Sequence, residues 1–244
     1  RDGWMSTKIK VFRSGFPPFL LPRLRQARVA GPLTESLSTM MTLFSGPTCP
    51  FSQSSRIVLH EKGCEFCIES LDLEGISPEH QAQFEAISPY RELPVLIERD
   101  LILYNVFVIN EYIDERFPHP QLMPADPVGR GRTRLFLNIF ERDLFPHVRV
   151  LENTQSTEAQ RETARRSLIY YLNFIAQRIG PTKFIMSDDF QMLDAVLAPI
   201  LWRLQHYGIT LPNESSKLSI YAERLFTRQS FIDSMTAQER SMRK

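Results

Sequence analysis

The chain has few cysteines, no apolar run long enough to cross a membrane and almost no net charge. Three cysteines in 244 residues are too few for the disulfide framework of a small secreted domain, and they fit a reducing compartment. The apolar run at residues 16–22 contains three prolines, and it is too short for a signal-peptide core or a membrane helix. We therefore expect a cytoplasmic protein that makes no contact with a membrane.

The formal net charge of +1 argues against non-specific nucleic-acid binding, which needs a basic surface. This average hides two unlike parts. Residues 1–39 hold seven Lys/Arg and two Asp/Glu, a net charge of +5, whereas the remaining 205 residues hold 22 and 26, a net charge of −4. We expect residues 1–39 to be a disordered basic extension. An Arg-rich transit peptide or a basic interaction arm are the alternatives.

The order of elements after Met41 is regular and predicts a compact α/β domain over residues 40–117. Gly63 is placed to end the first helix, and Ser77-Pro78 is placed to begin the second. The first crossover requires a parallel strand pair with a helix packed on it. In chain order we expect a strand at 42–45, a helix at 50–62, a strand at 66–73, a helix to 87, a hairpin of strands at 94–97 and 101–104, and a helix at 106–117.

Prolines then interrupt the pattern and separate a second domain. Residues 118–127 contain Pro118, Pro120, Pro124 and Pro127, so no helix can continue through this linker. Beyond it we find only helical periodicity, with apolar side chains at steps of three and four residues. We expect an all-helical domain over residues 128–235 and a C-terminal tail at 236–244. The expected helices run over 128–153, 158–179, 192–207 and 215–235.

Three motifs carry a resemblance to a known family. They are Met41-Thr42-Leu43-Phe44-Ser45-Gly46, then Arg56-Ile57-Val58-Leu59 with Glu61-Lys62-Gly63, and above all Asn110-Glu111-Tyr112-Ile113-Asp114-Glu115-Arg116-Phe117-Pro118-His119-Pro120 with Leu122-Met123-Pro124. Residues 41–230 resemble the glutathione transferase fold, a thioredoxin-like domain joined to a helical bundle. More closely, they resemble the stringent starvation protein A family of bacterial proteins that associate with RNA polymerase.

Cys49 is the candidate nucleophile of an enzymatic alternative. It stands at the start of the first helix, where the helix dipole lowers a thiol pKa. In thiol-type transferases this position forms mixed disulfides with glutathione, and Leu93-Pro94 matches the cis-proline corner that pairs with the glutathione backbone. The resemblance therefore implies glutathione as the cofactor of this alternative.

The remaining part of that glutathione site departs from the pattern. Transferases carry an acidic or amide residue followed by Ser or Thr at the head of the third helix, and this sequence has Asn105-Val106. Loss of one hydroxyl bond and one charge-assisted bond costs about 2–4 kcal/mol of binding. Arg91 stands where the turn before the cis-proline often has a small residue. We therefore expect a protein without catalysis and without a cofactor.

Other chemistry-bearing residues have simpler explanations. Cys64 and Cys67 have C-x-x-C spacing, but residues three apart in a strand face opposite surfaces, and no second Cys/His pair lies at ligand spacing. We therefore expect no metal site. Asp194 matches the acid of a capping box whose hydroxyl position holds Gln191, a poor N-cap. We expect a loss of about 1 kcal/mol unless Ser187 or Asp188 caps this helix instead.

The segment Phe117-Pro118-His119-Pro120 is the candidate partner-binding surface. Two prolines fix the backbone beside an aromatic side chain and an imidazole, which suits docking on a protein with little loss of entropy. By residue chemistry alone it could be a stiff linker, but in the related family this loop faces the partner. Arg99 and Leu122 are weaker candidates for the same surface, and Asp126 departs from the aromatic that relatives often have.

Together these features predict a homodimeric, starvation-type transcription regulator that docks on RNA polymerase holoenzyme with its housekeeping sigma factor. It would act through protein contacts, without catalysis and without reading DNA sequence directly. A body with a charge of −4 suits a basic partner. The alternative is a glutathione-dependent transferase or thiol reductase that uses Cys49.

Overall fold

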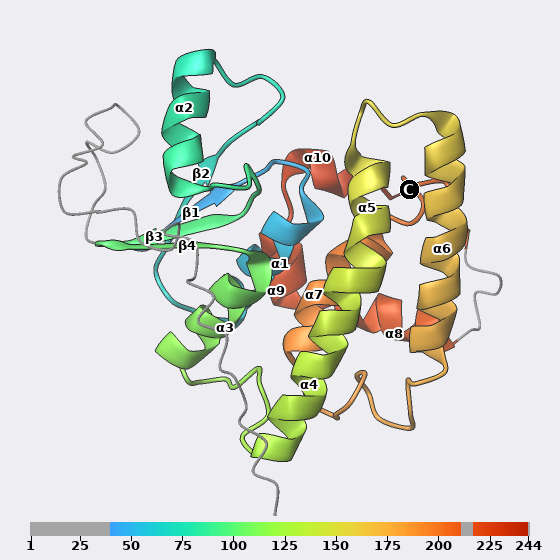
Figure 1. The fold of residues 1–244 in the computed structure, drawn as a ribbon. Helices are drawn as coiled ribbons and strands as arrows, with labels where there is room; N and C mark the ends of the chain where they lie inside the picture. Colours follow the sequence, from blue (N-terminus) through green and yellow to red (C-terminus); the bar gives the residue numbers. More distant parts are fainter. Residues whose placement is uncertain (1–39, 211–216, 244) are drawn as a thin grey trace, which may run out of the picture. The chain divides into compact units, whose positions relative to one another are not determined.

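A computed structural model describes residues 40–210 and 217–243, which belong to one compact unit (Figure 1). The expected basic extension, residues 1–39, lies outside the described residues. Within the described ranges, no helix has the length and apolar character needed to cross a membrane.

The first half of the unit is a mixed four-stranded sheet with the order β2-β1-β3-β4. β1 pairs parallel with β2 and antiparallel with β3, so the predicted crossover and hairpin are both confirmed. β2 is shorter than expected. The strands are β1 (Thr42–Ser45), β2 (Cys67–Ser70), β3 (Val95–Glu98) and β4 (Leu101–Tyr104).

Alternation along the strands divides the side chains between two helical layers. Leu43 and Leu96 belong to the main core, which includes residues of α1 (Pro50–Lys62) and α3 (Val106–Arg116). Phe44 and its neighbours on β3 form a second cluster with Phe84 of α2 (Pro78–Ile87). Successive strand residues point to opposite faces, so α2 covers one face and α1 with α3 the other (Figure 1).

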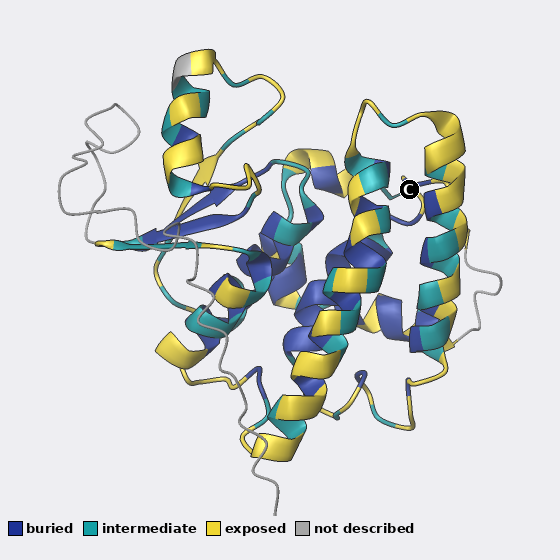
Figure 2. Cartoon of the chain, viewed as in Figure 1, coloured by how far each residue is buried: buried dark blue, intermediate teal, exposed yellow. Residues whose placement is uncertain are grey.

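The second half is helical, with shorter helices than the periodicity predicts. The expected helix at 128–153 is interrupted by a π-helical turn that ends at Leu144, and α5 then begins with Phe145-Pro146, where proline has no N–H for the α-helical hydrogen bonds. The elements are α4 (Pro127–Ile139), η1 (Phe140–Leu144), α5 (Phe145–Glu152), α6 (Glu158–Ala176), α7 (Met192–Trp202), α8 (Lys217–Phe226), α9 (Gln229–Ser234) and α10 (Ala237–Arg240). Figure 2 shows α7 almost entirely buried, whereas α4 and α6 expose one side.

Asp194 compensates for the poor cap of α7. Its carboxylate accepts hydrogen bonds from the backbone N–H of Gln191 (2.8 Å) and of Ile185 (3.3 Å), and from the hydroxyl of Tyr221 (2.6 Å). The two alternative caps are engaged elsewhere, since Ser187 accepts from the Asp189 N–H and Asp188 from the Lys183 N–H. The Asp194 half of the capping box is therefore formed although Gln191 stands at the N-cap.

The segment expected to be a C-terminal tail contains α10 and contributes a buried charge. Glu239 is fully buried between Arg56 of α1 and Arg203, with O···N distances of 2.6 Å and 2.5 Å. Hydrogen bonds from these two arginines and from Thr236 hold the loop before Cys49. Arg56 donates to the carbonyl of Gly46, and Arg203 donates to the carbonyl of Thr48. Thr236 donates to the carbonyl of Pro47. Thr236 and the two arginines that pair with Glu239 therefore hold the backbone of residues 46–48, directly before Cys49.

Candidate functional site

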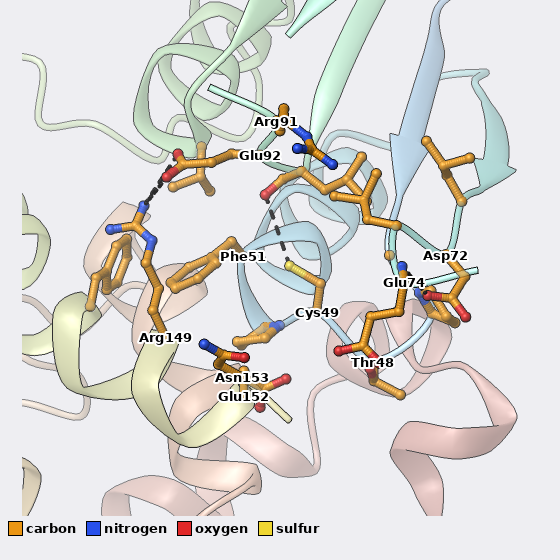
Figure 3. A pocket seen from close by; sticks show the side chains of 18 of the residues that line it. Thr48, Cys49, Phe51, Asp72, Glu74, Arg91, Glu92, Arg149, Glu152 and Asn153 are labelled. Carbon is orange, nitrogen blue, oxygen red and sulfur yellow. Dashed lines mark hydrogen bonds and ion pairs between the residues drawn. The ribbon is translucent and has the colours of Figure 1, made fainter. Parts of the chain in front are cut away.

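A cavity of about 750 Å³ opens between the beginning of α1 and the helix α5. Cys49 lies near its centre, with Asp72 and Glu74 on one side and Arg149 with Glu92 on the other (Figure 3). Four of the five residues of the predicted glutathione site line this cavity, namely Cys49, Leu93, Asn105 and Val106, and Pro94 follows Leu93 in the chain.

Cys49 is the N-cap of α1, and its sulfur accepts a hydrogen bond from the Ser52 N–H at 3.5 Å. The thiol in turn donates to the carbonyl of Leu93 at 3.9 Å, and the Leu93–Pro94 peptide is cis, as the resemblance implied. We expected the helix start to lower the pKa of this thiol. Instead, burial raises the pKa of Cys49 and outweighs the hydrogen bonds from Ser52, which lower it. At neutral pH the thiol is therefore protonated and a weak nucleophile.

Asn105 is committed to contacts within the protein. Its side-chain oxygen caps α3 by accepting from the N–H groups of Phe107 (2.9 Å) and Val108 (3.4 Å). Its amide nitrogen donates to Glu141 at 2.9 Å, and the next residue, Val106, is buried. The hydroxyl that captures a glutamyl carboxylate in transferases is missing, and the neighbouring amide faces a carboxylate of the protein itself.

Aromatic rings form one wall of the cavity, and an ion pair closes part of its mouth. The rings of Phe51 and Phe107 lie 4.5 Å and 5.2 Å from that of Phe145, measured between centroids. Arg149 lies over the ring of Phe51 at 5.2 Å and pairs with Glu92 at 3.2 Å. These two charged partners are 57 positions apart, so no sequence pattern indicated that they meet.

The predicted partner loop lies at the other end of α3, about 16 Å along an eleven-residue helix. Pro118, His119 and Pro120 are exposed, and Phe117 packs partly against the main core. Arg99 is exposed in the β3–β4 turn, next to Glu98, which pairs with Arg116 near the loop. Leu122 was wrongly expected on this surface: it is 1% exposed and belongs to the core.

A buried ion pair that sequence reasoning missed supports this loop. Lys62 of α1 and Asp114 of α3 are 2.5 Å apart, with side chains 0% and 3% exposed. Lys62 also donates to the carbonyl of Pro120, while Asp114 accepts from the backbone N–H groups of Leu122 (2.8 Å) and Met123 (3.0 Å). Both charges lie inside the family motifs, but their pairing across 52 positions is visible only in the fold.

A second cavity, of about 480 Å³, lies beside the loop. Asp188 and Asp189 are exposed at its rim, and Glu61 lies in its wall, where Arg228 donates to it. Within the described ranges, no group of three or more His, Cys, Asp or Glu side chains could hold a metal ion. Cys64 is half-buried and Cys67 exposed, and both are free thiols.

Comparisons with known proteins agree with this architecture. Residues 48–116 match the family model of the glutathione S-transferase N-terminal domain. A stringent starvation protein A homolog of Coxiella burnetii is 38% identical over 207 residues, which cover 84% of this chain and 96% of the relative. The chain belongs to the stringent starvation protein A family. A homolog of Histophilus somni in this family is 39% identical over 81% of this chain and 91% of its own length.

Solved structures confirm the glutathione transferase-like fold that the sequence predicted for this family member. A glutathione transferase from Methylococcus capsulatus has a TM-score of 0.72 at 24% identity, covering 83% of this chain and 98% of its own. At this identity the likeness shows the fold alone: a thioredoxin-like domain followed by a helical region.

Proposed function

We propose that this protein is a transcription regulator of the starvation-response type that docks on RNA polymerase holoenzyme with its housekeeping sigma factor. The observation that carries the proposal is the exposed segment Pro118-His119-Pro120, anchored by the half-buried Phe117 and supported by the buried ion pair of Lys62 with Asp114. A loop held in this way loses little entropy when a partner binds. The proposed role needs no catalysis and no cofactor.

The charge beside the loop favours a basic partner surface. Asp188 and Asp189 are exposed at the rim of the second cavity, and the buried Phe184 and Phe190 line its wall. The two exposed carboxylates suit an Arg or Lys side chain of the partner because they meet its charge, whereas the ring of Phe190 is already covered by Arg228 at 4.3 Å. We include this hollow in the proposed docking surface.

A pull-down of polymerase holoenzyme from purified components tests the proposal. The triple variant Pro118→Ala/His119→Ala/Pro120→Ala should lose binding, because it removes the rigid ledge without touching the core. A matched control, Arg166→Ala/Tyr170→Ala, changes two exposed residues of α6 and should bind as the unchanged protein does. Equal binding by both variants would show that the docking surface lies elsewhere.

A glutathione-dependent transferase or thiol reductase remains the second candidate, because a thiol in a cavity of about 750 Å³ faces a cis Leu93–Pro94 peptide. Calorimetric titration separates the two functions. We expect at most millimolar affinity for glutathione, since Asn105 and Val106 provide neither the charge nor the hydroxyl. Micromolar affinity together with thiol-transfer activity abolished by Cys49→Ser would favour the enzyme instead.

We propose that the protein acts as a homodimer and that α3 and α4 contribute to the contact. Val108 of α3 is 49% exposed, and Leu135 of α4 is 68% exposed. The ion pair of Glu111 with Arg134 joins the two helices. Apolar side chains on a surface framed by charged groups are typical of an interface between subunits.

A further inference from the structure

We propose that the Cys49 cavity binds a small organic cation, an amine with an apolar segment of the diamine type, rather than an anion. This goes beyond the docking function, since the cavity and the 117–120 loop lie at opposite ends of α3 and share no lining residue. The size of the cavity, about 750 Å³, is in the range of small-molecule sites. Its charge and its aromatic wall decide the class of ligand.

Carboxylates outnumber guanidinium groups in the lining. Two arginines line the cavity, and both are already paired: Arg149 with Glu92, and Arg91 with Glu85 at 3.4 Å outside the lining. In residues 40–210 and 217–243, the other four lining carboxylates have no Lys or Arg at ion-pair distance. These four are Asp72, Glu74, Glu141 and Glu152.

Neutral donors hold these carboxylates at fixed positions in the cavity. Asn105 donates to Glu141, Thr154 donates to Glu74 at 3.0 Å, and the hydroxyl of Tyr207 donates to Glu152. Figure 3 shows Glu74, Asp72 and Glu152 around the Cys49 thiol. Neutral donors orient Glu74 and Glu141 without cancelling their charge, whereas burial raises the pKa of Glu152 and disfavours its charged form. Glu74 and Glu141 therefore supply the negative potential that a ligand would meet.

A cation already occupies an aromatic and acidic position in the same cavity. The guanidinium of Arg149 lies over the ring of Phe51 and against the carboxylate of Glu92. Phe107 and Glu141 also line the cavity, and among the described residues no Lys or Arg forms an ion pair with Glu141. We expect an amine of the ligand to pair with the carboxylate of Glu141 and the alkyl chain to pack on the aromatic wall of the cavity.

Glutathione fits this environment poorly. It carries two carboxylates and one ammonium, so at neutral pH it brings a net negative charge to a lining that is itself negative. Both lining arginines are already paired with carboxylates, Arg149 with Glu92 and Arg91 with Glu85. A dication with a short alkyl chain has the opposite charge and places its apolar segment against Phe51, Phe107 and Phe145.

Disulfide probes of different charge test the electrostatic potential around Cys49 directly. In a Cys64→Ser/Cys67→Ser protein, Cys49 is the remaining cysteine. Its thiolate attacks one sulfur of the probe, forms a mixed disulfide and releases the other half as a thiolate. The probes are cystamine, a dication; bis(2-hydroxyethyl) disulfide, which is neutral; and 3,3′-dithiodipropionate, a dianion. Each rate is divided by the rate of the same probe with 2-mercaptoethanol.

We expect the normalised rate of cystamine to exceed that of the neutral probe by about tenfold at low ionic strength, and that of the dianion to fall below it. Added salt should bring the ratio of the cystamine rate to the neutral-probe rate closer to one. Glu141→Gln and Glu74→Gln should each reduce it, whereas Glu158→Gln, an exposed carboxylate on α6, should leave it unchanged. Equal normalised rates, or a faster dianion, would overturn the proposal.

A binding measurement that does not depend on the thiol completes the test. In a Cys49→Ser variant, calorimetric titration with 1,5-diaminopentane should show heat of binding that Glu141→Gln weakens, while glutathione shows none. Absence of diamine binding would overturn the proposal. This outcome is distinct from failure of the docking function, because the Cys49→Ser variant should still retain polymerase in the pull-down.

Discussion

At the scale of single residues, Asp194 shows how a buried acid both supports and limits stability. It accepts three hydrogen bonds at the start of α7. Even so, burial is the largest influence and raises the pKa of this carboxyl from 3.8 to about 6, against the opposing effects of Tyr221, Gln191, Ile185 and the charge of Arg228. The carboxyl therefore holds its proton more tightly in the folded protein than in the unfolded chain.

This difference predicts a pH dependence. Between about pH 4 and pH 6 the folded state binds more protons at Asp194 than the unfolded chain does. The protonated carboxyl therefore stabilises the folded state fully below about pH 4, and this contribution is lost as the pH rises through about 6. The loss amounts to about 3 kcal/mol in the free energy of unfolding. Urea unfolding of the unchanged protein and of Asp194→Asn should therefore give curves against pH that converge toward pH 7. Parallel curves would contradict the raised pKa.

The buried Lys62–Asp114 ion pair, which supports the partner loop, should contribute to the stability of the fold. Lys62→Met leaves Asp114 buried without its cation and should lower the free energy of unfolding by about 3–5 kcal/mol. Adding Asp114→Asn removes the uncompensated charge and should recover part of the loss. Chemical denaturation measures both, and a double variant no more stable than Lys62→Met alone would show that the pair does not act through charge.

At the scale of elements, α10 is a structural part of the fold although it is four residues long. Glu239 neutralises part of the charge that Arg56 and Arg203 bring into the interior. Burial lowers the pKa of Arg56, and the nearby Glu239 opposes that change. A short C-terminal helix thereby connects the two halves of the unit.

Removing this charge should destabilise the whole unit. Glu239→Gln leaves two buried guanidiniums without an anion, so the free energy of unfolding should fall by about 3–5 kcal/mol. Glu223→Gln breaks an exposed ion pair with Arg243 and is the matched control. Its cost should stay below about 1 kcal/mol. Thermal unfolding measures both, and equal midpoints would contradict a structural role for the buried carboxylate.

At the scale of the whole molecule, the proposed dimer predicts a change of mass. Leu135→Glu places a charge at the 68% exposed apolar position of α4 and should shift the protein from dimer to monomer in light scattering coupled to size exclusion. We expect the Leu135→Glu variant to stay folded, because the side chain of Leu135 lies outside the core. Ile220→Glu, at a 54% exposed position of α8, should leave the mass unchanged. A dimer that survives Leu135→Glu would place the contact elsewhere.

Local signals predicted the elements well where they were strong. Gly63 ends α1 with a positive φ of 57°, and Ser77 caps α2, both as the sequence indicated. Helical periodicity alone overestimated element length: α7 ends at Trp202 and the expected helix at 215–235 is divided into α8 and α9. Periodicity indicates which face of a helix is apolar, but it does not indicate where the backbone hydrogen bonds of the helix end.

The amino-acid sequence by itself determined the order of elements, the two-part organisation and the family, because caps, prolines and motifs act over a few neighbouring residues. Tertiary structure alone decided the charge partners and the state of the thiol. Glu239 meets Arg56 across 183 positions, and burial in the folded protein raises the pKa of Cys49. Burial and ion pairing depend on which distant segments of the chain meet in space, and a local sequence pattern does not specify those contacts.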